Sequence, residues 1–436
     1  MSSLTYYLEN VLSRKRFRPL VFLTVLAFAL SACSEVRSEE GGAEGDPIKI
    51  GYVTAQTGAL ASFGESDDFV VNQVREHFDS IGGITVAGKQ RDVEIIVRDS
   101  QSDPKQAAEV AGDLILKDNV DLIVTGHTPD IANPVADQGE ANGVPVISTL
   151  APWQPCFFGR GGTPDKPFKW TYHFFWGLED LETVYQDMWD QVDTNKKVGA
   201  LWPNDPDGNA FSAPETGFPD VTGKSGYKIA DYGLYTNGTQ DFTAQISRFK
   251  KEKVDILVGV PIPPDFATFW KQAAQQGFHP KFVTVAKSLL TPSNLNALGE
   301  LGNNLGTEVW WTPSHPYSSS LTGQTAQQLA DAYTAQTGQQ LTQFVGFVHA
   351  LFEVAATTLS RSDGTKDGIR KTLSSLKTDT VVGPLDWTSG PVPNVAKTPL
   401  VGGQWRRNAD KSFSLVVVSN KENPEIPVGG KVEALR

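Results

Sequence analysis

The residue patterns in this 436-residue chain that could support catalysis or nucleotide binding are incomplete. Residues 217–225 read Gly-Phe-Pro-Asp-Val-Thr-Gly-Lys-Ser, but five residues separate the glycines where a phosphate-binding P-loop has four. No Gly-x-Gly-x-x-Gly follows the first predicted strand, and no Gly-x-Ser-x-Gly nucleophile elbow occurs. These departures argue against a nucleotide site and against a hydrolase.

Metal-ligating and nucleophilic residues are scattered along the chain. The six histidines show no His-Glu-x-x-His spacing, and the two cysteines form no Cys-x-x-Cys pair. We therefore expect no metal site, no cofactor and no enzymatic activity. Cys156 has no obvious histidine partner, so we expect a small buried side chain at this position rather than a nucleophile.

Cys33 differs, because its sequence context predicts a covalent modification. A basic stretch at residues 14–18 precedes an apolar run that is too short for a membrane span and ends in Leu-Ser-Ala-Cys at position 33. This ending resembles the bacterial lipobox, in which the signal peptide is cut before a cysteine that carries lipid. We expect residues 1–32 to be a lipoprotein signal peptide and the protein to be lipid-anchored at the cell envelope. Lys15 interrupts the paired arginines of a twin-arginine signal, which favours the general export route.

The composition is that of an acidic protein with enough apolar residues for packed cores. The formal net charge is −12 and 39% of residues are hydrophobic. Without a dense Lys/Arg cluster outside the signal, nucleic acid is an improbable partner. The length exceeds what one core normally supports, which predicts two lobes.

Alternating apolar strands and amphipathic helices must position any binding residues. Residues 33–46 comprise the lipidated cysteine and a polar, Gly-rich tether. After it we expect strands at 48–54, 93–99, 122–125, 144–148, 197–202, 229–234, 254–260 and 282–285. Expected helices include one opening at Asp103-Pro104 and those over 241–251, 264–276, 325–337 and 343–359. This order predicts the α/β class, with two Rossmann-like lobes and parallel central sheets.

The loops at the strand ends are the candidate binding region. In open parallel sheets, ligands bind beyond the carboxyl ends of the strands. In the first lobe these loops are residues 54–64, 126–131 and 148–153. The aromatic stretches 170–176 and 309–313 are expected to be strands that cross between the lobes.

Five segments that follow one another along the chain carry a family resemblance. They are residues 48–64, 99–107, 144–148, 277–282 and, most distinctively, Val-Gly-Pro-Leu-Asp-Trp at 382–387. In this order they resemble the leucine/isoleucine/valine-binding protein family, the type I periplasmic solute-binding proteins of ABC importers, over about residues 47–420. The resemblance implies two lobes joined by three hinge crossings, a small-molecule solute in the cleft, and delivery to an ABC permease and ATPase complex in the membrane.

The resemblance also implies a division of the chain. Its parts are a signal peptide at 1–32, the lipidated cysteine and tether at 33–46, a first lobe at 47–172 and 310–380, and a second lobe with a C-terminal tail at 173–309 and 381–436. A ligand-sensing receptor of the same fold, coupled to a signalling partner, is the alternative function. The lack of a spanning segment after residue 33 weighs against a self-contained receptor.

Taken position by position, the resemblance implies ten ligand-binding residues. They are Phe63, Thr128, Asp130, Leu150, Ala151, Trp176, Glu179, Lys287, Trp311 and Phe344. Phe63 stands where the family packs an aromatic ring on the ligand. Thr128 lies in the loop that offers hydroxyls to the α-carboxylate of amino acids. Leu150 and Ala151 lie in the loop that contacts the ammonium and carboxylate, but Pro152 replaces the hydroxyl residue there.

Several of these positions have two interpretations. The charge of Asp130 repels a carboxylate, unless Asp130 only caps the following helix. Glu179 could hold a ligand cation or cap a helix. Trp311 and Phe344 could line the cleft or belong to the core.

Lys287 lies near the position where amino-acid binders have an acid. If Lys287 points into the cleft, it favours an anionic or carbonyl group on the solute, because a buried unpaired ammonium is costly; a solvated lysine is the alternative. We therefore expect an amphipathic solute somewhat larger than a free branched-chain amino acid, such as a carboxylate, amide or aromatic acid.

Overall fold

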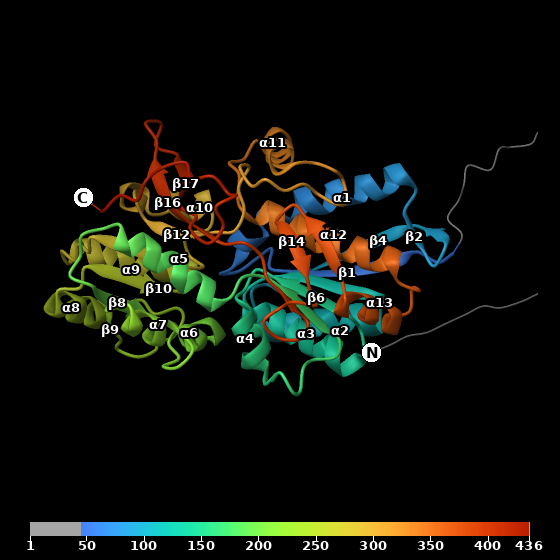
Figure 1. Cartoon of the computed structure of the whole chain (residues 1–436), viewed down its shortest axis with the longest axis horizontal. Coiled ribbons are helices and arrows are strands. Elements are labelled where there is room, and N and C mark those ends of the chain that lie inside the picture. Colours follow the sequence, from blue (N-terminus) through green and yellow to red (C-terminus); the bar gives the residue numbers. More distant parts are fainter. Residues whose placement is uncertain (1–44, 436) are drawn as a thin grey trace, which may run out of the picture. The chain divides into compact units, whose positions relative to one another are not determined.

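A computed structural model of the protein describes residues 45–435 (Figure 1). The predicted signal peptide, Cys33 and nearly all of the tether lie outside these residues. Within residues 45–435, no helix is both long enough and apolar enough to cross a membrane.

The first sheet has six parallel strands. Their order is β15 (Val395–Ala396), β7 (Thr171–Phe174), β6 (Val146–Thr149), β5 (Leu122–Gly126), β1 (Ile48–Thr54) and β4 (Val93–Asp99). Helices α1 (Asp67–Ile81) and α12 (Phe344–Arg361) cover one face, and α2 (Pro104–Leu116) and α3 (Pro129–Asn142) cover the other (Figure 1). Every residue of β5 and β6 is buried as a result.

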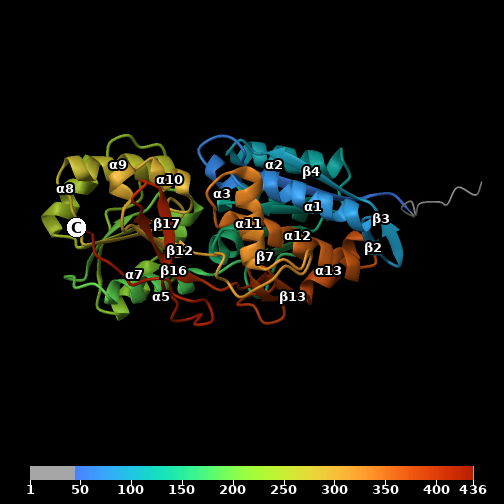
Figure 2. The ribbon, with the colours of Figure 1, turned by 90° about the horizontal axis from the view of Figure 1, so that it is seen from above.

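The second sheet has seven strands and is mixed. Its order is β17 (Phe413–Ser419), β16 (Val401–Arg407), β12 (Gly306–Val309), β11 (Phe282–Val285), β10 (Ile256–Gly259), β8 (Lys197–Leu201) and β9 (Lys228–Ala230). The strands from β12 to β9 are parallel, as predicted, but β16 and β17 add an antiparallel hairpin that the sequence analysis does not anticipate. Helices α8 (Thr243–Glu252) and α9 (Pro263–Gln275) cover one face, and α5 (Leu178–Asp190) and α7 (Phe218–Lys224) the other (Figure 2).

Three segments connect the two sheets. They follow β7, β12 and β15. The aromatic stretch at 170–176 differs from its expected role as a crossing, because its residues Thr171–Phe174 form β7 inside the first sheet. Residues 381–396, assigned above to the second lobe, lie beside the first sheet: β13 (Lys377–Thr380) and β14 (Gly383–Asp386) form a hairpin against α12, and β15 pairs with β7.

The other elements are short or local. They are β2 (Ile84–Val86), β3 (Lys89–Arg91), η1 (Ala61–Gly64), α4 (Trp153–Phe157), η2 (Phe158–Arg160), α6 (Pro206–Phe211), α10 (Pro292–Asn296), η3 (Gly299–Gly302), α11 (Ala326–Thr337) and α13 (Lys366–Ser374). The predicted start of α2 is confirmed, since the Asp103 carboxylate accepts the Gln106 N–H at 2.8 Å. Cys156 in α4 is buried as expected, and burial raises the pKa of its thiol.

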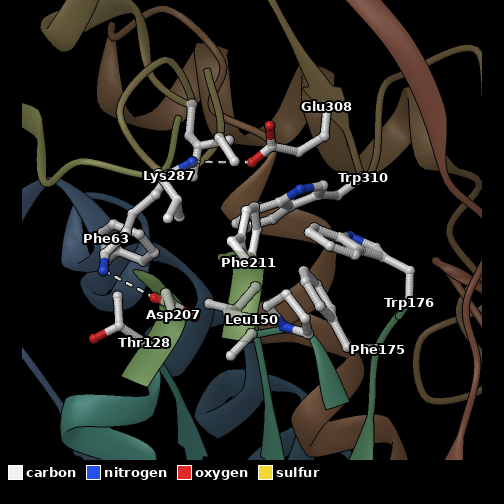
Figure 3. Close-up of a pocket in the computed structure, with 15 residues that line it drawn as sticks. Phe63, Thr128, Leu150, Phe175, Trp176, Asp207, Phe211, Lys287, Glu308 and Trp310 are labelled. Atoms are coloured by element: carbon white, nitrogen blue, oxygen red, sulfur yellow. Dashed lines mark hydrogen bonds and ion pairs between the residues drawn. The ribbon is translucent and has the colours of Figure 1, made fainter. Parts of the chain in front are cut away.

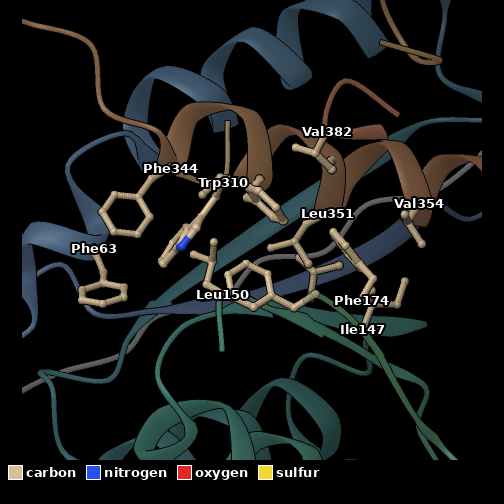
Figure 4. Close-up of a cluster of buried hydrophobic side chains, with 14 of the residues drawn as sticks. Phe63, Ile147, Leu150, Phe174, Trp310, Phe344, Leu351, Val354 and Val382 are labelled. Atoms are coloured by element: carbon tan, nitrogen blue, oxygen red, sulfur yellow. The ribbon is translucent and has the colours of Figure 1, made fainter. Parts of the chain in front are cut away.

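Helix α12 is the centre of the first core. Its residues Leu351 and Val354 lie among buried side chains of the first sheet, and Phe344 lies beside Phe63 and Trp310 (Figure 4). Gly346 lets the helix approach Trp311, because a Cβ at this position would lie 2.4 Å from the indole. The indole N–H of Trp311 donates to the carbonyl of Val381 at 3.1 Å, which fixes the ring in the core.

We expect Gly346→Ala to destabilise the protein by about 1–3 kcal/mol, because the added methyl group overpacks the contact with Trp311. Gly223→Ala in α7 is the matched control, since a Cβ there meets no atom within 4 Å. The control should be neutral or stabilising by up to about 1 kcal/mol, because alanine favours a helix over glycine. Urea unfolding of both variants measures the difference, and equal stabilities would contradict the packing argument.

Candidate ligand-binding site

A cavity with about 290 Å³ of empty space lies between the carboxyl ends of the two sheets (Figure 3). This figure includes space that is open to solvent, so the room enclosed between the side chains is smaller. The lining residues are Phe63, Thr128, Leu150, Ala151, Pro152, Phe175, Trp176, Asp207, Phe211, Val260, Ala286, Lys287, Leu290, Glu308 and Trp310.

The strand directions explain why these residues meet. Leu150, Phe175, Val260, Ala286 and Trp310 are each the first residue after a strand, namely β6, β7, β10, β11 and β12. Parallel strands end at the same edge of their sheet, so their following loops converge. The cavity is therefore the meeting point of loops from both lobes.

Two of the lining residues adopt a backbone conformation that is unusual outside glycine. Leu150 has φ of 71° and Lys287 has φ of 68°. The left-handed region costs a non-glycine residue on the order of 1–2 kcal/mol. Such residues cluster at functional sites, where the surrounding structure holds them. Here Leu150 is the first residue after β6 in the first lobe, and Lys287 is the second residue after β11 in the second lobe.

Aromatic rings form the wall of the cavity. The centroid of Phe175 lies 4.6 Å from that of Trp176 and 4.9 Å from that of Trp310. Phe63 packs on Phe344 with centroids 4.8 Å apart. Figure 3 shows the rings of Phe175, Trp176 and Trp310 lying together. A planar or branched apolar group fits such a wall.

A buried ion-pair cluster faces the aromatic wall. The ammonium of Lys287 lies 2.9 Å from an oxygen of Asp205 and 2.8 Å from an oxygen of Asp207. All three side chains are about 4% exposed. Burial alone would lower the pKa of Lys287, but Asp207 and Asp205 raise it, so the lysine stays charged.

The two aspartates differ in their remaining partners. The oxygens of Asp205 also accept the Gly208 N–H at 2.8 Å and the Asn237 amide at 3.1 Å. Burial would raise the pKa of Asp205, but Lys287 and these donors lower it overall. Asp207 has fewer donors, and burial raises its pKa. Among residues 45–435, no group hydrogen-bonds to its second oxygen, Oδ1.

Glu308 completes the polar side of the cavity. It accepts the Lys287 backbone N–H at 3.1 Å and the Tyr185 hydroxyl at 2.6 Å. Burial raises the pKa of Glu308. One oxygen of Glu308 thus holds the loop after β11, and the other holds Tyr185 of α5.

Three other lining residues carry buried polar atoms that bond to nothing within the described part of the chain. These atoms are the hydroxyl of Thr128 and the indole nitrogens of Trp176 and Trp310. A buried donor without a partner costs about 1–3 kcal/mol. Together with Asp207, these residues can hydrogen-bond a molecule in the cavity.

The structure brings six of the ten implied residues to the cavity: Phe63, Thr128, Leu150, Ala151, Trp176 and Lys287. Lys287 is neither solvated nor unpaired, since two carboxylates neutralise it. The argument from Lys287 for an anionic solute was therefore wrong, because that lysine already has its counter-charges.

The other four implied residues lie outside the lining. Asp130, in the first turn of α3, faces a separate groove together with Asp205. Glu179 pairs with Lys397 at 2.9 Å near the crossings. Trp311 belongs to the core, and Phe344 packs against the ring of Phe63 without lining the cavity itself.

The residues that the sequence analysis missed are mainly on the second lobe. They include Asp207, Phe211, Glu308 and Trp310. One usable signal was available, since Asp205-Pro206 repeats the helix start seen at Asp103-Pro104 and so places Asp207 in a first turn. The other signal was the alternation of side chains in the extended segment after β12. Consecutive side chains point in opposite directions there, so Trp310 and Trp311 cannot both face the cavity.

Comparison with known proteins gives one family. The family model described as "Periplasmic binding protein" matches residues 47–409. A curated relative, the Leu/Ile/Val-binding protein of Escherichia coli K12, is 23% identical over 347 residues, covering 78% of this chain and 87% of the relative.

Solved structures share the fold. A leucine-binding protein from Thermotoga maritima superposes with a TM-score of 0.69 at 18% identity, covering 86% of this chain and 99% of that one. A solute-binding protein of an ABC transporter from Rhodopseudomonas palustris, in complex with 3,4-dihydroxybenzoic acid, gives a TM-score of 0.66 at 19% identity, with 87% and 99% covered.

Lys287→Met should destabilise the protein by about 3–5 kcal/mol near pH 8, because two buried aspartates lose their counter-charge. Without the lysine, the pKa values of both aspartates rise in the folded state, so the folded variant binds protons more readily than the unfolded chain. The loss should therefore shrink as the pH falls to 5.

Lys397→Met is the matched control for this substitution. Lys397 also contacts two carboxylates, Glu179 and Asp180, but its side chain is 36% exposed. We expect this variant to lose at most about 1 kcal/mol. Urea unfolding at both pH values tests the pair, and similar losses in the two variants would refute the role of burial.

Proposed function

Because the chain belongs to the periplasmic binding protein family, which includes the leucine/isoleucine/valine-binding proteins, we propose that it is the solute-binding lipoprotein of an ABC importer. It captures a small solute between its lobes and delivers it to a permease and ATPase complex in the membrane. The relatives compared above are named as binding proteins, and we propose that no bond is made or broken at the site.

The observation that carries this proposal is the cavity between the strand ends. Both lobes line it, and four lining residues have buried polar atoms without a partner in residues 45–435. A molecule that supplies these hydrogen bonds removes the cost of leaving them unmade. The same molecule contacts both lobes and therefore favours their closed arrangement.

Contacts between the lobes support the closing step. Ser293 of α10 donates a hydrogen bond to Glu65, which precedes α1. Burial raises the pKa of Glu65. Helix α6 of the second lobe also contacts α3 and α4 of the first. These contacts form only when the lobes approach each other, so they add to the closure that the solute favours.

The relatives and the wall of the cavity support a proposed class of solute. The Escherichia coli relative is named for leucine, isoleucine and valine, and the Rhodopseudomonas palustris protein is bound to an aromatic acid. We propose that this chain takes an amino acid or a related amide, carboxylate or aromatic acid. The aromatic wall and the polar atoms beside it favour a solute with one apolar group and a polar head.

A thermal-shift screen of the twenty amino acids, their amides and hydroxybenzoic acids tests the proposal, since a saturating solute raises the melting temperature. Trp310→Phe and Trp176→Phe remove an indole N–H and keep a ring. We expect each to weaken binding of the solute found in the screen by roughly five- to tenfold, the value of about one hydrogen bond.

Trp270→Phe is the control for these substitutions, because the Trp270 indole N–H donates to the Leu301 carbonyl at 2.8 Å and neither residue lines the cavity. It should lose about 0.5–1.5 kcal/mol more stability than the cavity variants and keep its affinity. A panel without any stabilising compound, or equal affinity in all three variants, would count against the cavity as the binding site.

The envelope anchor is proposed from Cys33, which lies outside the described residues. Cys33→Ala should move the protein from the membrane fraction to the soluble fraction and leave solute affinity unchanged, because the cavity does not involve the lipid. Fractionation followed by calorimetry with the solute from the screen measures both. Retention in the membrane fraction would mean that the cysteine is not the anchor.

A further inference from the structure

We infer that the solute is a cation without a free carboxylate, such as an amino-acid amide or a primary amine with an aromatic or branched body. This inference rests on the proposed function and deepens it, because it assigns the head group that the cavity accepts: of the proposed solutes it keeps the amino-acid amides, and it adds primary amines. Asp207 holds the ammonium group, and the aromatic wall holds the rest.

Asp207 has the acceptor capacity that an ammonium group needs. Its side chain is buried, lines the cavity and uses one oxygen for Lys287 at 2.8 Å. The other oxygen has no donor within residues 45–435. Asp205 cannot take this role, because its two oxygens already accept Gly208, Asn237 and Lys287.

The balance of charge favours a cation. Asp205, Asp207 and Lys287 together carry a net charge of −1 when ionised, and Glu308 and Asp130 add further carboxyl groups nearby. Among the lining residues, Lys287 is the single cationic side chain, and both of its contacts are carboxylates. An added ammonium neutralises the buried cluster, whereas an added carboxylate increases its uncompensated charge.

Two positions in the first-lobe loops cannot donate a hydrogen bond to a carboxylate. The loops after β5 and β6 place Pro129 and Pro152 next to the cavity-lining Thr128 and Ala151, and proline has no N–H. Asp130 adds a negative charge to the first turn of α3, where an anion would otherwise be favoured. These loops therefore offer a carboxylate the hydroxyl of Thr128 and backbone N–H groups, but no charged donor.

The wall suits the remainder of such a solute. Aromatic faces attract a cation by about 0.5–2 kcal/mol when water is excluded. The indole N–H groups of Trp176 and Trp310 are neutral donors, and the carbonyl of an amide can accept from them. An amino-acid amide thus supplies an ammonium for Asp207, an acceptor for the indoles and an apolar group for the rings.

Two matched series of compounds test the inference with the unmodified full-length protein. One consists of phenylalaninamide, 2-phenylethylamine, phenylalanine and 3-phenylpropanoate. The other consists of leucinamide, 3-methylbutylamine, leucine and 4-methylpentanoate. Within each series the apolar body is kept and the head group changes from cation to zwitterion to anion.

We expect the amide or the amine of at least one series to bind at least about tenfold more tightly than the amino acid, a difference of about 1.4 kcal/mol, with the acid weakest. Equal or tighter binding of the amino acid or the acid would overturn the inference. The proposed function would still stand in that case, because a solute would have bound.

Asp207→Asn keeps the shape of the side chain and removes its charge. This substitution should weaken the binding of the cationic compound by roughly 10- to 100-fold, because a buried charged hydrogen bond is lost. It should also reduce the preference of the protein for the cationic compound over the amino acid of the same series. Asp265→Asn is the control, since Asp265 is equally buried in the same lobe but does not line the cavity. A similar loss in both variants would remove Asp207 as the ammonium partner.

If no compound of either series binds, the inference fails, and the screen described above then decides the proposed function. If a compound in that screen binds and has no cationic group, the result supports the proposed solute-binding function and refutes the inference that the solute carries an ammonium group. If the screen is also negative, the cavity is not a solute site, and both proposals fall.

Discussion

Hydrogen bonding between parallel strands fixes where each strand ends, and it brings loops from two separate sheets to one cavity. Residues as distant in sequence as Phe63, Leu150, Lys287 and Trp310 meet there because each follows a strand in register with its neighbours. The helices that cover both faces of each sheet exclude water from the hydrogen bonds between the strands and so keep the strands in register. Two residues in left-handed conformation, Leu150 and Lys287, then turn the chain at the strand ends.

The cavity combines an apolar wall with charges that are buried in pairs. The aromatic wall makes the surroundings apolar, and a charged lysine without a counter-charge would be costly to bury there. Lys287 is tolerated because Asp205 and Asp207 lie within 3 Å of its ammonium. The loop after β8 and the loop after β11 are thereby held together, and one oxygen of Asp207 is left for another partner.

Most strands and helices of this fold can be predicted from the sequence, because apolar runs and Asp-Pro helix starts are local patterns. β1, β4 and β11 have the bounds that the pattern predicts. The site is harder, because its contacts are not local. Lys287 and its partners are separated by about 80 residues, so the sequence around the lysine does not reveal that two carboxylates already balance its charge. Trp310 and Trp311 are neighbours in the sequence, but Trp310 lines the cavity and Trp311 lies in the core. The residue type alone cannot distinguish these two positions.

The ion pairs of Lys397 have a consequence for how freely the lobes move. Lys397 follows β15 and binds Glu179 and Asp180 at the start of α5, so it ties two of the three crossings together. These groups are partly exposed to solvent, and dissolved ions screen such pairs over a Debye length of about 8 Å at physiological ionic strength. The buried cluster of Lys287 is shielded from this effect. The stiffness of the hinge therefore follows the salinity of the surroundings, while the charge balance of the cavity does not.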